Sequence, residues 1–229
     1  MSFGDVIRSE TRPSLIRLPT GIGGNASTIW YCDSGVDDAV YELKTLDLSA
    51  LRTEDATFLI PTGIGGDSNT IWHCDGNADK IYELSIIDLL WIRGEFLPGD
   101  NPSGIGGDAS TIWHCDINTD QVYELKTSDL SVQRMADAPG SPAGIGGDAS
   151  TIWYTDTDDD KVYELKTSDF SVLRMADAPN TGPAGIGGDR RTIWYTDNNG
   201  LKVYELDAEP ADLGGGGTLA DVLVRAGFL

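Results

Sequence analysis

Basic residues are scarce in this chain. Its 229 residues include 16 Lys and Arg against 37 Asp and Glu, which gives a formal net charge of −21 at pH 7. A surface with this charge repels the phosphates of nucleic acids and of anionic lipid headgroups. The composition therefore argues against nucleic acid and membrane surfaces as partners. It favours solubility and a surface that attracts cations.

Long apolar runs are also missing. No stretch approaches the ~18 apolar residues that a membrane-spanning helix needs, although 40% of the residues are hydrophobic and can build a large core. The N-terminal segment MSFGDVIRSE lacks the basic start and the apolar run of a secretory signal. We expect a soluble protein without a signal peptide, which would be cytoplasmic if Met1 is the native start.

Cysteine is rare. The three cysteines, Cys32, Cys74 and Cys115, each follow a tryptophan by two positions, and Thr155 and Thr196 hold that place after two later tryptophans. Equal positions of neighbouring repeats lie further apart than the ~7 Å Cα limit of a disulfide. We therefore expect three free thiols that serve as small buried fillers, interchangeable with Thr. A thiolate metal site is the weaker alternative, because its ligands usually come at short spacing.

One motif is abundant instead. The pattern GIGG, followed by TIW, occurs five times, and its tryptophans recur about every 40 residues. They are Trp30, Trp72, Trp113, Trp153 and Trp194. A period near 40 fits a β-propeller blade or a pair of helices.

Composition decides between the two. Each unit opens on Pro and Gly, and then carries short segments rich in β-branched and aromatic residues, such as TIWYTD, KVYEL and SVLRM. Four short strands separated by turn residues predict one propeller blade. The innermost strand would be GIGG, where glycine lets backbones approach at a tight axis, and TIW would form the aromatic layer between blades.

The number of strands predicts how the ring closes. The three inner strands occur five times, but the outer strand follows them only four times, at 50–53, 91–94, 132–135 and 172–175. The missing one matches Val6–Glu10, where IRSE resembles LRTE of the first repeat. We therefore predict an all-β, five-bladed propeller over residues 1–213, with four antiparallel strands per blade and an N-terminal strand that completes blade 5. Residues 214–229 would be a glycine linker and a tail that forms either a short helix or an extra strand.

The blade pattern PAGIGGDASTIWYTDTDDDKVYEL, Pro142–Leu165, resembles blades of the NHL, virginiamycin B lyase and gluconolactonase-like propeller group. The resemblance covers nearly the whole chain and implies the propeller fold. Enzymes of that group are expected to place polar ligands for a metal or a substrate around the mouth of the axial channel. The five inner strands here offer Gly, Ile, Gly and Gly, which argues against a site of that kind.

Two histidines, His73 and His114, follow repeat tryptophans at a position that is Tyr31, Tyr154 or Tyr195 in the other repeats. Exchange with Tyr indicates an aromatic ring that packs and offers one polar atom. A general base is the alternative.

The loops between the second and third strands carry Asp-x-(Asp/Asn)-x-Asp. These residues are Asp75, Asn77, Asp79, Asp116, Asn118, Asp120, Asp156, Asp158 and Asp160. The alternation matches the start of an EF-hand loop, but the Gly at position 6 and the Glu at position 12 are absent. The pattern fits a tight turn in which Asp and Asn bond their own backbone, with weak Ca²⁺ binding as the alternative.

Arginines recur at one position of the outer strand, and glutamates recur on the neighbouring strand. The arginines are Arg8, Arg52, Arg93, Arg134 and Arg174, and the glutamates are Glu42, Glu83, Glu124, Glu164 and Glu205. We expect one cross-strand ion pair per blade. A ring of arginines for an anionic ligand is the alternative.

The near identity of the repeats favours a non-enzymatic binding propeller with equivalent sites for a protein or glycan ligand, because repeated weak sites gain through avidity. The alternative is a lyase- or lactonase-like enzyme that uses a divalent cation. An enzyme needs one asymmetric constellation, whereas a binding module tolerates equivalence.

Overall fold

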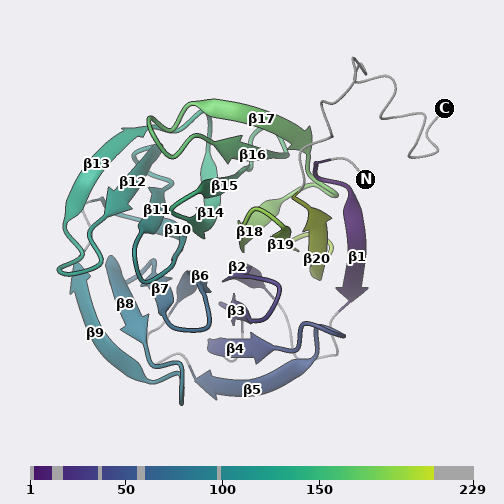
Figure 1. The fold of residues 1–229 in the computed structure, drawn as a ribbon, viewed down its shortest axis with the longest axis horizontal. Coiled ribbons are helices and arrows are strands. Elements are labelled where there is room, and N and C mark those ends of the chain that lie inside the picture. Colours follow the sequence, from purple (N-terminus) through teal and green to yellow (C-terminus); the bar gives the residue numbers. More distant parts are fainter. Residues whose placement is uncertain (1–2, 12–17, 36–37, 56–59, 97–98, 209–229) are drawn as a thin grey trace.

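The computed structural model describes residues 3–11, 18–35, 38–55, 60–96 and 99–208. These ranges form twenty strands in five four-stranded antiparallel sheets arranged around one axis (Figure 1). The five-bladed propeller predicted from the repeat is confirmed. Within the same ranges, no helix is long and apolar enough to cross a membrane. The C-terminal tail 214–229 lies outside the described residues.

The blades follow the chain, and each runs from the axis outward as strands A, B, C and D. Blade 1 contains β2 (Pro19–Gly24), β3 (Ile29–Asp33), β4 (Ala39–Leu43) and β5 (Ala50–Asp55). Blade 2 contains β6 (Pro61–Gly66), β7 (Ile71–Asp75), β8 (Lys80–Leu84) and β9 (Trp91–Phe96). Blade 3 contains β10 (Pro102–Gly107), β11 (Ile112–Asp116), β12 (Gln121–Leu125) and β13 (Val132–Asp137). Blade 4 contains β14 (Pro142–Asp148), β15 (Thr151–Asp156), β16 (Lys161–Leu165) and β17 (Val172–Asp177). Blade 5 contains β18 (Pro183–Gly188), β19 (Thr192–Asp197), β20 (Lys202–Asp207) and β1 (Val6–Thr11).

Glycine at the axis has the predicted cause. A Cβ added to Gly23 would lie 2.6 Å from the Cα of Gly65 in the next blade, and one added to Gly65 would lie 2.7 Å from the Cα of Gly106. Side chains at these positions would force the A strands apart. The GIGG sequence is therefore needed for the tight inner ring.

The repeat tryptophans join neighbouring blades. Each is almost fully buried, and its Nε1 donates to a backbone carbonyl in the A–B turn of the next blade at 3.0–3.1 Å. The last of these bonds runs from Trp194 to Asn25 and so links blade 5 to blade 1. The hydrophobic clusters follow the same rule, since Trp194 packs with Ile22 and Tyr31 of blade 1. The core therefore lies between the blades.

The arginines of the D strands join blades a second time. Each Nε pairs with the predicted glutamate, as in Arg52 with Glu42 at 2.5 Å and Arg93 with Glu83 at 2.6 Å. The terminal nitrogens of Arg93 donate to the carbonyls of Thr127 and Ser128 in the next blade. The same pairing with glutamate occurs at Arg8, Arg134 and Arg174. The cross-strand pairs expected from the sequence are present, and these guanidinium groups are engaged within the fold.

The N-terminal strand closes the ring by pairing with β20. It also rebuilds the C–D turn that blade 5 lacks. In blade 1, Lys44 N donates to Ser49 O and Leu48 N donates to Lys44 O. In blade 5, Asp207 N donates to Asp5 O at 2.9 Å, and Gly4 N donates to Asp207 O at 3.0 Å. The two ends of the propeller thus form a split copy of the turn.

Side chains complete this copy. Phe3 stacks on Trp153 with 5.5 Å between ring centroids, and Arg174 lies over Phe3 at 4.1 Å. Between blades 3 and 4, Phe170 packs on Trp113, and the guanidinium of Arg134 lies 4.5 Å from the centroid of the Phe170 ring. By its hydrogen bonds Gly4 takes the position of Phe170, and the ring of the preceding Phe3 supplies the packing that Phe170 provides in its own turn.

The cysteines are free and buried, as predicted. Burial raises the pKa of the Cys74 thiol to about 12 and also raises the pKa of Cys32. These thiols therefore stay protonated and unreactive at neutral pH.

A second residue explains why Cys alternates with Thr. Blades with Cys in strand B carry Thr or Ser in strand A, and Thr62 Oγ1 donates to Pro102 O of the next blade at 2.5 Å. Blades with Thr in strand B carry Ala in strand A, and Thr155 Oγ1 donates to Ala184 O at 2.9 Å. Between blades 4 and 5 the linking hydroxyl thus comes from strand B instead of strand A. In all five blades the two sequence positions change together.

This pairing predicts strong coupling between Thr62 and Cys74. Thr62→Ala alone should cost about 1 kcal/mol by removing the link between blades. Cys74→Thr alone should cost a similar amount by crowding a second hydroxyl beside the first. The double variant reproduces blade 4 and should regain native stability to within about 0.5 kcal/mol. Urea unfolding of all four proteins measures the coupling, and additive losses would contradict it.

Candidate functional site

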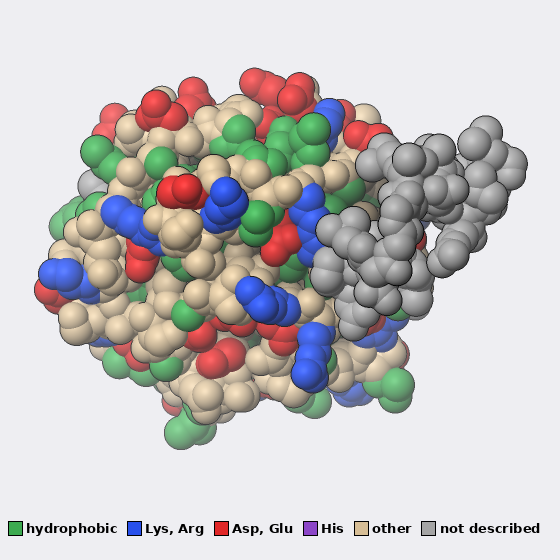
Figure 2. Space-filling view, turned by 45° about the horizontal axis from the view of Figure 1, so that its top comes forward, with side chains coloured by type: hydrophobic (Ala, Val, Ile, Leu, Met, Phe, Trp, Pro, Cys, Tyr) green, Lys and Arg blue, Asp and Glu red, His purple; other side chains and the backbone are tan. Residues whose placement is uncertain are grey.

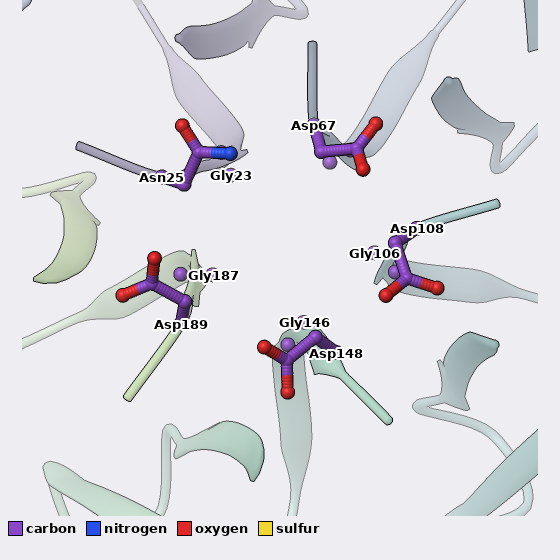
Figure 3. Close-up of a pocket in the computed structure, with 15 residues that line it drawn as sticks. Gly23, Asn25, Asp67, Gly106, Asp108, Gly146, Asp148, Gly187 and Asp189 are labelled. Atoms are coloured by element: carbon purple, nitrogen blue, oxygen red, sulfur yellow. The ribbon is translucent and has the colours of Figure 1, made fainter. Parts of the chain in front are cut away.

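The mouth of the propeller axis forms a small cavity of about 120 Å³. Its lining consists of the last two glycines of each A strand and of one acidic or amide residue that follows them (Figure 3). These residues are Asn25, Asp67, Asp108, Asp148 and Asp189. All five blades therefore contribute the same kind of residue to one opening.

The A–B turns fix these side chains. Asp108 Oδ1 accepts the backbone N–H of Ser110 at 2.7 Å and that of Thr111 at 2.9 Å. Asn25 makes the same two bonds in blade 1 with its own Oδ1. Figure 3 shows the side chains following one another around the opening instead of pointing at its centre. One oxygen is thus held by the turn, and the half-buried residue presents its second polar atom at the rim.

Charge is uneven around this opening. Blades 2, 3 and 4 each contribute one carboxylate, and blade 1 contributes the neutral Asn25. In blade 5, Asp189 is followed by the exposed Arg190 and Arg191. Figure 2 shows acidic side chains over the surface in view, with basic side chains between them. The rim offers hydrogen-bond acceptors and negative charge, which suit a ligand rich in hydroxyl or cationic groups.

The expectation that the Gly-Ile-Gly-Gly strands leave the axial mouth without polar side chains is wrong, because the Asp or Asn that follows each strand lines the mouth. A usable signal was present, because Asp and Asn between two strands commonly accept a hydrogen bond from the backbone N–H two residues further on. The position of that turn at the axis follows only from the ring geometry.

Neither histidine lines the axial cavity. His73 is buried in β7, with Nδ1 3.0 Å from Gly63 O and the ring stacked on Tyr82. His114 has the equivalent contacts with Gly104 and Tyr123. Burial lowers the pKa of each histidine to about 4. Both rings are therefore neutral at pH 7 and serve as packed aromatic residues.

The Asp-rich loops lie at the opposite end of strand B from the axial opening, because the strands of a blade alternate in direction. The first Asp of each loop is buried, and Asp75 Oδ1 accepts N–H groups from Asn77 and Ala78 at 2.8 and 3.0 Å. The third residues, Asp79, Asp120 and Asp160, adopt left-handed φ values of 51–52°. The loops thus form the tight turns that the pattern predicts.

No group of three or more His, Cys, Asp and Glu side chains within the described ranges comes together as a metal site. Asp160 Oδ1 accepts a hydrogen bond from the backbone N–H of Gly182 at 2.9 Å. Asp156 Oδ2 is buried and has no hydrogen-bond partner among the described residues. Weak Ca²⁺ binding by these loops stays a prediction.

Millimolar Ca²⁺ should raise the stability of the fold only modestly, by on the order of 1 kcal/mol per site, if the loops bind it at ~10⁻⁴–10⁻³ M. Thermal unfolding in CaCl₂ measures this, with NaCl of matched ionic strength as the control for general screening. The variant Asp156→Asn, Asp158→Asn, Asp160→Asn should lose its share of any Ca²⁺-specific gain. An unchanged Ca²⁺-specific gain in stability would show that this loop does not bind Ca²⁺. A micromolar affinity measured by calorimetry would contradict weak binding.

Comparison with known proteins places the chain by its fold. No protein-family model and no curated protein sequence matches it. Among solved structures, it is similar to glutaminyl cyclase from Myxococcus xanthus, with a TM-score of 0.72, 11% identity, and 90% of this chain and 99% of that chain covered. Virginiamycin B lyase from Staphylococcus aureus gives a TM-score of 0.52 and 18% identity over 86% of this chain and 68% of that chain. A chain of a nidogen–laminin complex gives a TM-score of 0.61 and 16% identity, with 83% of this chain and 76% of that chain covered.

These similarities confirm the propeller resemblance that the blade motif indicates. The fold they share with this chain is that of a β-propeller, here with five blades. Its structural neighbours include a cyclase, a lyase and a member of a protein complex, so the fold alone does not determine the activity.

Proposed function

We propose that this protein is a non-enzymatic binding propeller, in which the A–B turns around the axial mouth are equivalent sites for one multivalent protein or glycan ligand. The observation that carries the proposal is the repetition of the rim. Four Asp and one Asn occupy equal places around a single opening, and each is held by the same kind of turn. Such sites act together on a ligand that repeats its own groups.

The chemistry of the rim favours polar ligands. Carboxylate and amide oxygens accept hydrogen bonds from sugar hydroxyls, and the carboxylates pair with cationic groups of a protein. The glycine walls of the cavity leave the backbone close to whatever enters.

The enzyme alternative has less support at this site. A lyase or a lactonase would use one asymmetric constellation, whereas the cavity lining is glycine, Asn and Asp repeated around the ring. The two histidines are buried at other places and bonded to backbone carbonyls.

A glycan array with the purified protein, followed by calorimetry on the best ligand, tests the proposal. Asp67→Asn, Asp108→Asn, Asp148→Asn and Asp189→Asn form a matched series, because Asn25 shows that Asn supports the same turn. We expect affinity to fall stepwise along the series and at least tenfold in the quadruple variant, as weak equivalent sites are removed. Melting temperatures should stay close to that of the unmodified protein.

Two results would contradict this function. Full binding by the quadruple variant would place the site elsewhere, and complete loss at one substitution would mean a single asymmetric site. Chemical conversion of the bound ligand would favour the enzyme alternative.

A further inference from the structure

Blade 2 departs from the repeat at its C–D turn and at the start of β9. Residues 85–92 read SIIDLLWI, whereas the same segment of blade 3, residues 126–133, reads KTSDLSVQ. Five residues of blade 2 are apolar and differ from their counterparts in blade 3. They are Ile86, Ile87, Leu90, Trp91 and Ile92. The blade 3 counterparts, in the same order, are Thr127, Ser128, Ser131, Val132 and Gln133. Three hydroxyl side chains and one amide have thus become apolar, and a valine has become a tryptophan.

These apolar side chains face solvent. The exposed fractions are 83% for Ile87, 53% for Leu90, 54% for Trp91 and 55% for Ile92. The outer position of β9 in its blade leaves this segment on the circumference of the ring (Figure 1). Several large apolar side chains exposed together on one turn and the strand that follows it are unusual for a surface without a partner. We call residues 86–92 the blade 2 patch.

Folding does not require the patch. The blade 2 turn is closed by Ser85 N to Leu90 O at 2.8 Å and by Leu89 N to Ser85 O at 2.8 Å. The blade 3 turn has the same two bonds, Lys126 N to Ser131 O and Leu130 N to Lys126 O, both at 2.8 Å. Leu89 and Leu130 are both buried anchors. Because Thr and Ser serve the turn equally well in blade 3, the apolar residues of blade 2 need another explanation.

The patch also has one positive charge fewer than the matching turns of other blades. Ser85 stands where the other complete C–D turns have Lys44, Lys126 and Lys166. Each of those lysines favours the ionised form of the aspartate in its own turn. The blade 2 turn keeps its aspartate, the exposed Asp88, but has no lysine of its own. A hydrogen bond from Ser85 and the charge of Arg52 in blade 1 lower the pKa of Asp88, and Arg52 also donates to the carbonyls of Ile86 and Ile87. Because Arg52 is itself paired with Glu42, the apolar surface keeps one net negative charge, which is complementary to an apolar segment that carries a cation.

We propose that the blade 2 patch docks a peptide segment of a partner protein with apolar side chains and at least one Lys or Arg that pairs with Asp88. The outermost strand of a sheet can also accept an extended segment along its free edge. A second copy of this chain is a poorer occupant, because it would bring two chains of formal charge −21, and two copies of Asp88, together. This site lies apart from the axial mouth and does not depend on the function proposed for it.

Trp91 reports on this patch directly. The other five tryptophans are buried in the repeat motif, so changes in emission from an exposed tryptophan arise from Trp91. The experiment titrates the full chain with a short peptide of alternating lysine and valine, and with a matched peptide of alternating glutamate and valine. We expect a saturable blue shift with the lysine peptide, and at least a tenfold higher concentration for the same shift with the glutamate peptide.

Two variants serve as controls. Asp88→Asn should lower the affinity for the lysine peptide about two- to fivefold, as expected for one exposed ion pair. The variant Ile86→Thr, Ile87→Ser, Leu90→Ser, Ile92→Gln copies blade 3 and keeps Trp91 as the reporter, and it should lose the shift. The blade 3 sequence already folds in this chain, and an unchanged melting temperature would verify that the variant is native.

Three outcomes would overturn the proposal. One is the absence of a saturable shift with the lysine peptide, and another is an equal shift in the blade 3 copy. The third is a dimer seen by sedimentation in the unmodified chain and lost in the copy, which would make a second copy the occupant.

Discussion

Removal of residues 1–12 is expected to open the ring and to lower the melting temperature by roughly 10–20 °C, which corresponds to a loss of about 5 kcal/mol for a chain of this size. The deletion removes the pairing of β1 with β20, the stacking of Phe3 on Trp153 and the bond from Arg8 to Leu46 O in blade 1. It also exposes β20 as an unpaired apolar edge, which favours aggregation. Calorimetry and light scattering measure both effects.

A synthetic peptide of residues 3–11 provides the control for this deletion. If β1 acts through pairing, the peptide added in trans should restore part of the lost melting temperature, whereas a scrambled peptide should not. A truncated chain that stays monomeric with an unchanged melting temperature would contradict closure by this strand.

The two buried histidines should make the fold sensitive to mild acid. Their pKa is about 4 in the folded protein, against an ordinary value of 6.5. Between these values the unfolded chain binds protons that the folded chain does not, so stability falls as the pH drops from 6.5 to 4. The free energy of unfolding should fall in total by roughly 3 kcal/mol per histidine. Above pH 6.5 the histidines should have no effect.

The chain supplies its own control for this effect. Tyr occupies the histidine position in blades 1, 4 and 5, so the double variant His73→Tyr, His114→Tyr should fold and lose this part of the pH dependence. Urea unfolding of both proteins at pH 7, 5.5 and 4.5 measures the difference, in which the titration of the many carboxylates largely cancels. Parallel curves for the two proteins would show that the histidines are accessible to protons in the folded state.

The repeat made the fold predictable from the sequence. The copies of each strand pattern reinforce one another. The count of outer strands, together with the match of IRSE to LRTE, assigns Val6–Glu10 to blade 5, where the structure has β1 from Val6 to Thr11. The tryptophan layer and the arginine–glutamate pairs follow from the same alignment, since equal positions must make equal contacts.

The axial site was harder to predict, because its residues meet only through the ring. Asp67 and Asp189 are far apart in sequence, and nothing local to either shows that both reach one opening. The hydrogen bond from Arg93 to Ser128 O of the next blade could not be predicted for the same reason. In the Asp-rich loops, the sequence pattern favours a turn over a cation site, because the Gly and the Glu of an EF-hand loop are missing. The contacts of Asp75 Oδ1 with Asn77 and Ala78 support the turn.

The split C–D turn offers the most direct test of the closed ring of equivalent blades. Asp207, Ala208, Ser2, Phe3, Gly4 and Asp5 would align with Lys44–Ser49 if Ala208 were joined to Ser2. The bond from Arg174 to Ala208 O supports this alignment, since Arg8 makes the matching bond to Thr45 O. A circular permutant can therefore join these residues, omit Met1 and 209–229, and begin at Ser168 in the exposed turn of blade 4.

The decisive measurement is the melting temperature of this permutant, taken together with its mass in solution. Opening the chain between Thr167 and Ser168 gives blade 4 the split turn that blade 5 has in the native chain, and blade 5 gains a continuous turn. A ring of equivalent blades predicts a monomer that melts within about 5 °C of the unmodified chain, a difference of one or two kcal/mol. An unfolded permutant, or one destabilised as much as the chain lacking residues 1–12, would contradict it.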